Sequence, residues 1–132
     1  MATRKPSSTG KSPDELAEAL NQSQLKNYLD AQPSDARKFL QKLRDLIRSA
    51  ARGATDSFGY GTPEIRMKGE TLFRYEAMQR HVKLSPIPAA IDRAEFKGLR
   101  ATKDAIQLPY SKPLPVDILN KLVKARIAEL GK

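Results

Sequence analysis

The spacing of apolar residues changes once along this chain, and this change constrains the fold more than any other feature. Up to residue 51 apolar residues recur every three or four positions, as Phe39, Leu43 and Ile47 do, which predicts an amphipathic helix over 34–51. From Thr55 the spacing falls to two, the period of a half-buried strand. A chain with both periods is predicted to fold as an α+β domain in which helices lie on a sheet.

Short turns separate the predicted strands. The segments 68–70 and 78–80 each join two stretches of alternating polarity, as hairpin turns do, so neighbouring strands should be antiparallel. A short helix over 88–99, a strand over 105–108 and a closing helix over 116–130 complete the chain. We predict an antiparallel sheet of about five strands with helices packed on one face, in the order α-α-β-β-β-β-α-β-α.

The first 23 residues are predicted to stand apart from this domain. Residues 1–12 are polar, with proline and glycine, and indicate a flexible leader. A short helix at 13–20 is expected to follow and to end in the polar segment 21–23. Leu25, Tyr28 and Leu29 then form the apolar stripe of the first helix of the domain, which Gln32-Pro33 ends. The remaining residues, 24–132, have the length of a single domain.

Charge is the most informative property of the composition. The chain has 24 Lys and Arg against 15 Asp and Glu, a net charge of +9. The first 23 residues carry as many acids as bases, so the whole excess lies in 24–132. This balance favours an anionic ligand, an acidic protein partner or a nucleic acid.

Several classes of function lack the residues that they need. The chain has no cysteine and one histidine, which excludes disulfides, thiolate metal sites and a cysteine nucleophile. No phosphate-binding loop and no catalytic triad is recognisable, so we predict a binding protein rather than an enzyme. No apolar run approaches the roughly 20 residues of a membrane span. Lack of cysteine suits the reducing cytoplasm, where we expect the protein.

Alternation along the strands predicts which side chains lie on the face away from the helices. If Ile65, Phe73 and Leu84 point to the core, the opposite parity holds Arg66, Arg74, Glu76, His81, Lys83 and Ser85. A second set of cations forms a stripe on helix 34–51: Arg37, Arg44 and Arg48. Both sets fit either a solvated surface that opposes aggregation or a surface that binds nucleic acid or another polyanion. The predicted open face lacks the aromatic residues on which bases stack.

One residue interrupts the apolar stripe of the closing helix. Arg126 lies among Leu122, Val123 and Ile127, where an unpaired guanidinium would be costly. It either binds a carboxylate or strand carbonyl groups, or it lies at the floor of a pocket for an anionic ligand. The sequence leaves both alternatives open.

Five short motifs, in order, resemble those of the YdhG-like family of small bacterial domains. The resemblance extends over residues 24–130. The motifs are Tyr60-Gly61-Thr62-Pro63, Lys68-Gly69, His81-Val82-Lys83-Leu84-Ser85-Pro86, Lys103 ahead of Ile106-Gln107-Leu108-Pro109, and Pro113-Leu114-Pro115 before a helix with Lys124-Ala125-Arg126.

The resemblance implies an α+β fold similar in outline to frataxin, and a non-enzymatic binding role. Some members are described as frataxin-like intracellular iron chaperones, which makes iron a candidate cofactor beside small anions. The resemblance implies no particular metal ligands, so none is assigned. The implied binding residues, which we expect to meet at one end of the sheet, are Tyr60, Pro63, His81, Lys103 and Arg126.

Overall fold

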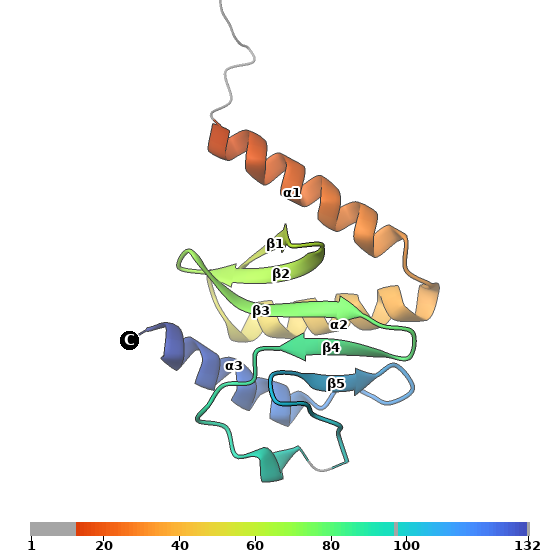
Figure 1. Ribbon diagram of the computed structural model, residues 1–132, viewed down its shortest axis with the longest axis vertical. Helices are drawn as coiled ribbons and strands as arrows, with labels where there is room; N and C mark the ends of the chain where they lie inside the picture. Colours follow the sequence, from red (N-terminus) through yellow and green to blue (C-terminus); the bar gives the residue numbers. More distant parts are fainter. Residues whose placement is uncertain (1–12, 97, 132) are drawn as a thin grey trace, which may run out of the picture.

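The computed structural model describes residues 13–96 and 98–131, and its elements follow the predicted order (Figure 1). The fold class is therefore confirmed as α+β, although the element predicted over 88–99 is a single turn of 3₁₀ helix. The elements are α1 (Pro13–Asp30), α2 (Ser34–Ala50), β1 (Thr55–Gly59), β2 (Thr62–Met67), β3 (Glu70–Ala77), β4 (His81–Ser85), η1 (Arg93–Glu95), β5 (Ile106–Pro109) and α3 (Val116–Leu130).

The five strands form one antiparallel sheet in the order β1-β2-β3-β4-β5. Tight turns set this order at the first two hairpins. Each has two central residues with positive φ, Tyr60-Gly61 at 54° and 80° and Lys68-Gly69 at 54° and 76°. Such turns match the twist of paired strands, and glycine at the second position adopts the left-handed backbone without strain. The turn predicted over 68–70 is thus one residue shorter, because Glu70 already pairs with Met67.

One face of the sheet is covered by α2 and α3, and the core lies between these layers (Figure 1). The predicted parity holds in β4, where Val82 and Leu84 are buried while Lys83 is exposed. It fails at Leu72, which is buried beside Phe73. The register between β2 and β3 shifts at this point, so Leu72 has no partner on β2 and turns toward the core, as bulged residues can.

The first helix differs from its prediction. A single helix, α1, runs from Pro13 to Asp30. The helix expected at 13–20 therefore continues through segment 21–23 into the helix predicted to end at Gln32-Pro33, and the predicted boundary at Gln24 falls inside α1. The residues at 21–23 are polar but do not break helices, and nothing there stops the intrahelical bonds. Residues 1–12 of the predicted leader lie outside the described residues.

Both outer strands of the sheet have neighbours. Helix α1 lies along β1, where Leu25 is buried and the Gln22 amide donates to the Asp56 carbonyl at 2.8 Å (Figure 1). At the other edge, the Gln107 amide of β5 donates to the carbonyl of Arg100 at 2.8 Å, and Ala101 bridges to Ile106. These contacts satisfy backbone groups that an outer strand otherwise leaves free.

Candidate functional site

Arg126 binds strand carbonyl groups, which is the first of its two predicted alternatives. Its Nε donates to the Leu72 carbonyl at 2.9 Å and its Nη2 to the Thr71 carbonyl at 2.8 Å, while Nη1 lies 3.2 Å from a carboxylate oxygen of Glu129. All three nitrogens are therefore engaged. The guanidinium fastens α3 to the bulge of β3, where the irregular pairing leaves two carbonyl groups for it.

Tyr60 and Pro63 occupy different surroundings although they share one motif. Tyr60 lies in the β1–β2 turn with 92% of its surface exposed, and the Arg74 guanidinium lies 4.8 Å from its ring centroid. Pro63 is buried in β2 opposite Phe58. Tyr60 is thus the accessible member of the motif, and its ring covers a cation rather than a cavity.

His81 and Lys103 lie near opposite ends of β4. His81 begins β4 and pairs with Pro109. Lys103 lies in a loop that contacts the segment after β4, where the Ile87 backbone amide donates to the carbonyl of Asp104, the residue after Lys103. Only the backbone of Lys103 has a described contact, a carbonyl that accepts from Arg93.

The implied binding residues are therefore not brought together. Tyr60 and His81 lie toward one end of the sheet, on different hairpins, while Lys103 and Arg126 lie toward the other. Arg126 also lies on the helix side. Each hairpin reverses the strand direction, so residues distant along the chain alternate between the two ends and their spacing does not reveal which end they share.

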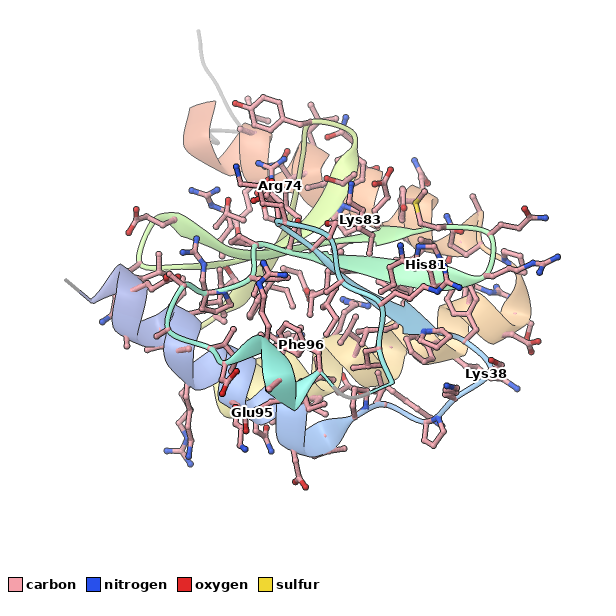
Figure 2. The ribbon with its side chains drawn as sticks, turned by 60° about the horizontal axis from the view of Figure 1, so that its bottom comes forward. Lys38, Arg74, His81, Lys83, Glu95 and Phe96 are labelled. Atoms are coloured by element: carbon pink, nitrogen blue, oxygen red, sulfur yellow. The ribbon has the colours of Figure 1, made fainter. Side chains whose placement is uncertain are left out.

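The open face of the sheet contains a buried carboxylate that the sequence analysis overlooked. Glu64 on β2 is 3% exposed, and its oxygens lie 2.7 Å from Arg74 and 3.4 Å from Arg66. The carboxylate occupies space over Gly59, where a Cβ atom would lie 3.1 Å from Oε2. Two of the three cations predicted for this face are thus paired, and Lys83 is the exposed one; Figure 2 shows Arg74 and Lys83 on the side of the sheet opposite Phe96.

The arginine stripe of α2 is also paired in part. Asp56 of β1 lies 2.7 Å from Arg44 and 3.1 Å from Arg48, and its side chain is only 10% exposed. The nearby Tyr75 hydroxyl is buried without a hydrogen-bond partner. Burial raises the pKa of Tyr75 well above its ordinary value, an effect that Arg44 opposes and Asp56 adds to. Arg37 alone of the stripe is exposed without an ion pair among the described residues.

A different set of cations surrounds a cavity of about 240 Å³ at the β4–β5 end of the sheet. Gln107 and Pro109 of β5 and His81 of β4 come from the strands, and three loops supply the rest. We call it the His81 cavity, and its lining residues are Arg80, His81, Gly98, Leu99, Arg100, Gln107, Pro109 and Lys112.

Backbone hydrogen bonds hold these loops against the sheet. Tyr110 donates to the carbonyl of Arg80 at 3.1 Å, and Gln107 donates to that of Arg100 at 2.8 Å. Gly98 adopts a φ of 75°, a left-handed conformation that suits glycine and turns the chain before Leu99. The cations are therefore positioned by fixed backbone, although Arg80, Arg100 and Lys112 have exposed side chains.

The electrostatics of the His81 cavity are one-sided. Among residues 13–96 and 98–131, its lining includes two guanidinium groups, an ammonium group and an imidazole but no carboxylate. Within residues 13–96 and 98–131, no ion pair involves Arg80, Arg100 or Lys112. Of its lining, His81 alone was predicted as a binding residue, and Gln107 and Pro109 belong to one of the five motifs. The three other cations lie in turns and loops, where no periodicity indicates the direction of a side chain.

Metal ligands do not gather anywhere in the described part of the chain. No group of three or more His, Asp or Glu residues there could hold a metal ion. Glu64 and Asp56, whose side chains are largely buried, already contact arginines. Among the described residues, no helix has the length and apolar character needed to cross a membrane.

Comparison with known proteins defines the class of fold. No family model and no curated protein matches the sequence. Among solved structures, the fold is similar to that of a DUF1801-family protein, YdhG from Bacillus subtilis, with a TM-score of 0.71 and 14% sequence identity. The match covers 83% of this chain and 93% of that one. The predicted resemblance to the YdhG-like family is thus confirmed at the level of the fold.

Proposed function

We propose that this protein is a non-enzymatic domain that binds a small anion in the His81 cavity. The observation that carries the proposal is the convergence of Arg80, Arg100 and Lys112 on one cavity whose lining has no acid. Guanidinium groups present paired N–H donors that match the oxygens of a carboxylate or phosphate, and lysine adds a point charge. The motif series and the shared fold support a relation to the YdhG-like family.

The polar strand residues add directional groups to this charge. His81 and Gln107 line the cavity from neighbouring strands, two register positions apart. An amide and an imidazole can each donate a hydrogen bond to an anion oxygen. Strand residues are held more rigidly than loop cations, so they would orient the anion while the cations supply attraction.

Iron handling, which the family resemblance suggested, does not fit the described residues. A resident iron ion needs several carboxylate or imidazole ligands around one point, and no such group is present in the described part of the chain. The enclosed carboxylates Glu64 and Asp56 are held by cations that would repel a metal ion. We therefore assign no step to iron.

Binding of nucleic acid or another polyanion was predicted through two basic surfaces. Both surfaces lose free charge in the structure, because Arg66 and Arg74 share Glu64 while Arg44 and Arg48 share Asp56. Polyanion affinity depends on cations that remain available to neutralise phosphates. The arrangement thus favours the compact His81 cavity over an extended surface.

Titration with inorganic phosphate, followed by amide and imidazole NMR signals, tests the proposal. We expect saturable shifts at His81 and Gln107, and binding at least tenfold weaker in an Arg100→Gln variant. Lys124→Gln is the matched control, because it removes one exposed cation from α3, outside the cavity lining.

Two results would overturn the proposal. One is a titration without saturable shifts around the cavity. The other is an equal loss of affinity in the Arg100 and Lys124 variants, which would show attraction by net charge alone. A salt series distinguishes binding in the cavity from attraction by net charge, since the logarithm of the affinity of diffuse, polyanion-type binding falls linearly with the logarithm of the salt concentration.

A further inference from the structure

A second cavity, of about 250 Å³, adjoins the His81 cavity and differs from it in chemistry. The two share Gly98, Leu99, Pro109 and Lys112. The second, which we call the Phe39 cavity, extends toward the helix layer, and the rest of its lining is Phe39, Leu108, Pro113, Pro115 and Ile118. Among the described residues, Lys112 is the one charged residue of its lining.

The walls of the Phe39 cavity are fixed by packing. Phe39 of α2 meets Tyr110 edge to face, with ring centroids 5.4 Å apart, and the Tyr110 hydroxyl donates to the Met78 carbonyl at 2.8 Å. Pro113 and Pro115 restrict the backbone that leads into α3. Leu99 is held by a hydrogen bond from its amide to the Phe96 carbonyl. An apolar group can therefore enter a preformed space.

Size indicates that one ligand would use both cavities. An apolar cavity of about 150 Å³ already accommodates benzene, so the Phe39 cavity can take a ring or a short alkyl chain. Each cavity alone falls below the roughly 300 Å³ at which pockets for drug-sized ligands begin. A ligand that is charged at one end and apolar at the other would fill the pair, with Lys112 at their junction.

We propose that the ligand is an amphipathic small anion, a carboxylate or phosphate that carries a short alkyl or aromatic group. This inference rests on the proposed function, because it places the anionic head in the His81 cavity. The charge complementarity of that cavity and the apolar lining of its neighbour together select this class. A bare inorganic anion would leave the Phe39 cavity without a partner.

The straight-chain carboxylates from acetate to pentanoate test the inference by the same NMR titration. We expect affinity to rise about fourfold per added methylene until the cavity is filled, which follows from the transfer free energy of a buried CH₂. The methyl groups of Leu99 and Ile118 should shift with the longer acids only. A series of alkyl phosphates, from methyl to butyl phosphate, repeats the test with the other head group. It shows whether the cavity prefers a carboxylate or a phosphate.

An Ile118→Phe variant narrows the Phe39 cavity and should abolish the rise of affinity with chain length. Ile127→Phe is the matched control, since Ile127 is a partly buried isoleucine of the same helix outside both cavities. Thermal unfolding verifies that each variant folds. Should the Ile118 variant not fold, the chain-length series on the wild-type protein still decides the question.

The possible outcomes separate the two proposals. Saturable binding with equal affinity for every chain length would overturn the amphipathic ligand and leave anion binding standing. A chain-length effect that persists in Ile118→Phe would overturn the placement of the alkyl group. Absence of binding by every acid and by inorganic phosphate would overturn the proposed function itself.

Discussion

The arginines around Glu64 and Asp56 and the cations around the His81 cavity carry the same charges in different surroundings. At Glu64 and Asp56, two arginines share one enclosed carboxylate. At the His81 cavity, Arg80, Arg100 and Lys112 gather without one. The net charge of +9 counts both groups alike. The comparison shows that the position of a few acids, rather than the number of bases, decides where an anion can bind.

Five substitutions test this comparison. The largest effect is expected from Asp56→Asn, which leaves Arg44 without its carboxylate at a position where its side chain is only 14% exposed. Loss of one partner from a largely buried pair should lower the free energy of unfolding by about 3 kcal/mol. Urea denaturation measures the change. Asp45→Asn, on the exposed side of α2, is the control, and an equal loss there would contradict the role of the pair.

Glu64→Gln removes the carboxylate that forms ion pairs with Arg66 and Arg74 on the open face of the sheet. We expect a loss of about 2 kcal/mol, less than at Asp56, because Arg66 and Arg74 are each about one-third exposed and solvent screens them. The freed arginines should also give the open face a new affinity for phosphate. Glu76→Gln on the next strand gains the same net charge. If both variants bind phosphate equally, the pairing at Glu64 has no special effect.

Gln107→Glu makes the reverse change, because it adds a carboxylate to the lining of the His81 cavity. Repulsion of the anion and attraction of the surrounding cations should weaken phosphate binding at least tenfold, or about 1.4 kcal/mol. Calorimetric or NMR titration measures the affinity. Gln79→Glu introduces the same charge in the β3–β4 turn outside the cavity. Retention of wild-type affinity by the Gln107 variant would show that the anion binds elsewhere.

The smallest effect concerns the hydroxyl of Tyr75 beside the Arg44–Asp56 pair. Tyr75→Phe removes a buried group that makes no hydrogen bond and should stabilise the protein by about 1 kcal/mol. The pKa of Tyr75 is raised in the folded state, so ionisation of this tyrosine favours unfolding. The free energy of unfolding is therefore unaffected by Tyr75 ionisation below the unfolded pKa of about 10, and it falls as pH rises from there toward the folded pKa. The variant should thus lose less stability above pH 10.

Tyr110→Phe supplies the contrast for the tyrosine prediction. Its hydroxyl donates to the Met78 carbonyl at 2.8 Å, so the same change should destabilise by about 1 kcal/mol. Burial also raises the pKa of Tyr110 and of Tyr28, so part of the alkaline sensitivity will remain in either variant. Equal effects of the two substitutions would contradict the difference in hydrogen bonding.

The layers of the fold were predictable, because alternation in β4 and the helical period of α2 report directly which side chains are buried. The continuity of α1 was not, since the polar residues at 21–23 suit both a helix and a loop. The bulge at Leu72 was equally hidden, because a register shift is decided by the pairing of two strands.

The candidate site was predictable only in part. The alternation of side chains indicated that His81 points away from the core. It could not show that Glu64 would be enclosed by two arginines, because that depends on the absence of a side chain at Gly59. Arg80, Arg100 and Lys112 belong to turns whose direction is set by hydrogen bonds between distant segments, such as that from Tyr110 to Arg80. Local patterns contain no signal for such contacts.

The segment 98–102 lies on the outer edge of β5 and also supplies Gly98, Leu99 and Arg100 to the His81 cavity. Any motion that opens the cavity on this side also uncovers the backbone of β5, a template for another chain to add a strand. An anion that holds Arg100 in place would thereby act against intermolecular strand addition. Aggregation rates in phosphate and in chloride at equal ionic strength should differ accordingly, with the slower rate in phosphate.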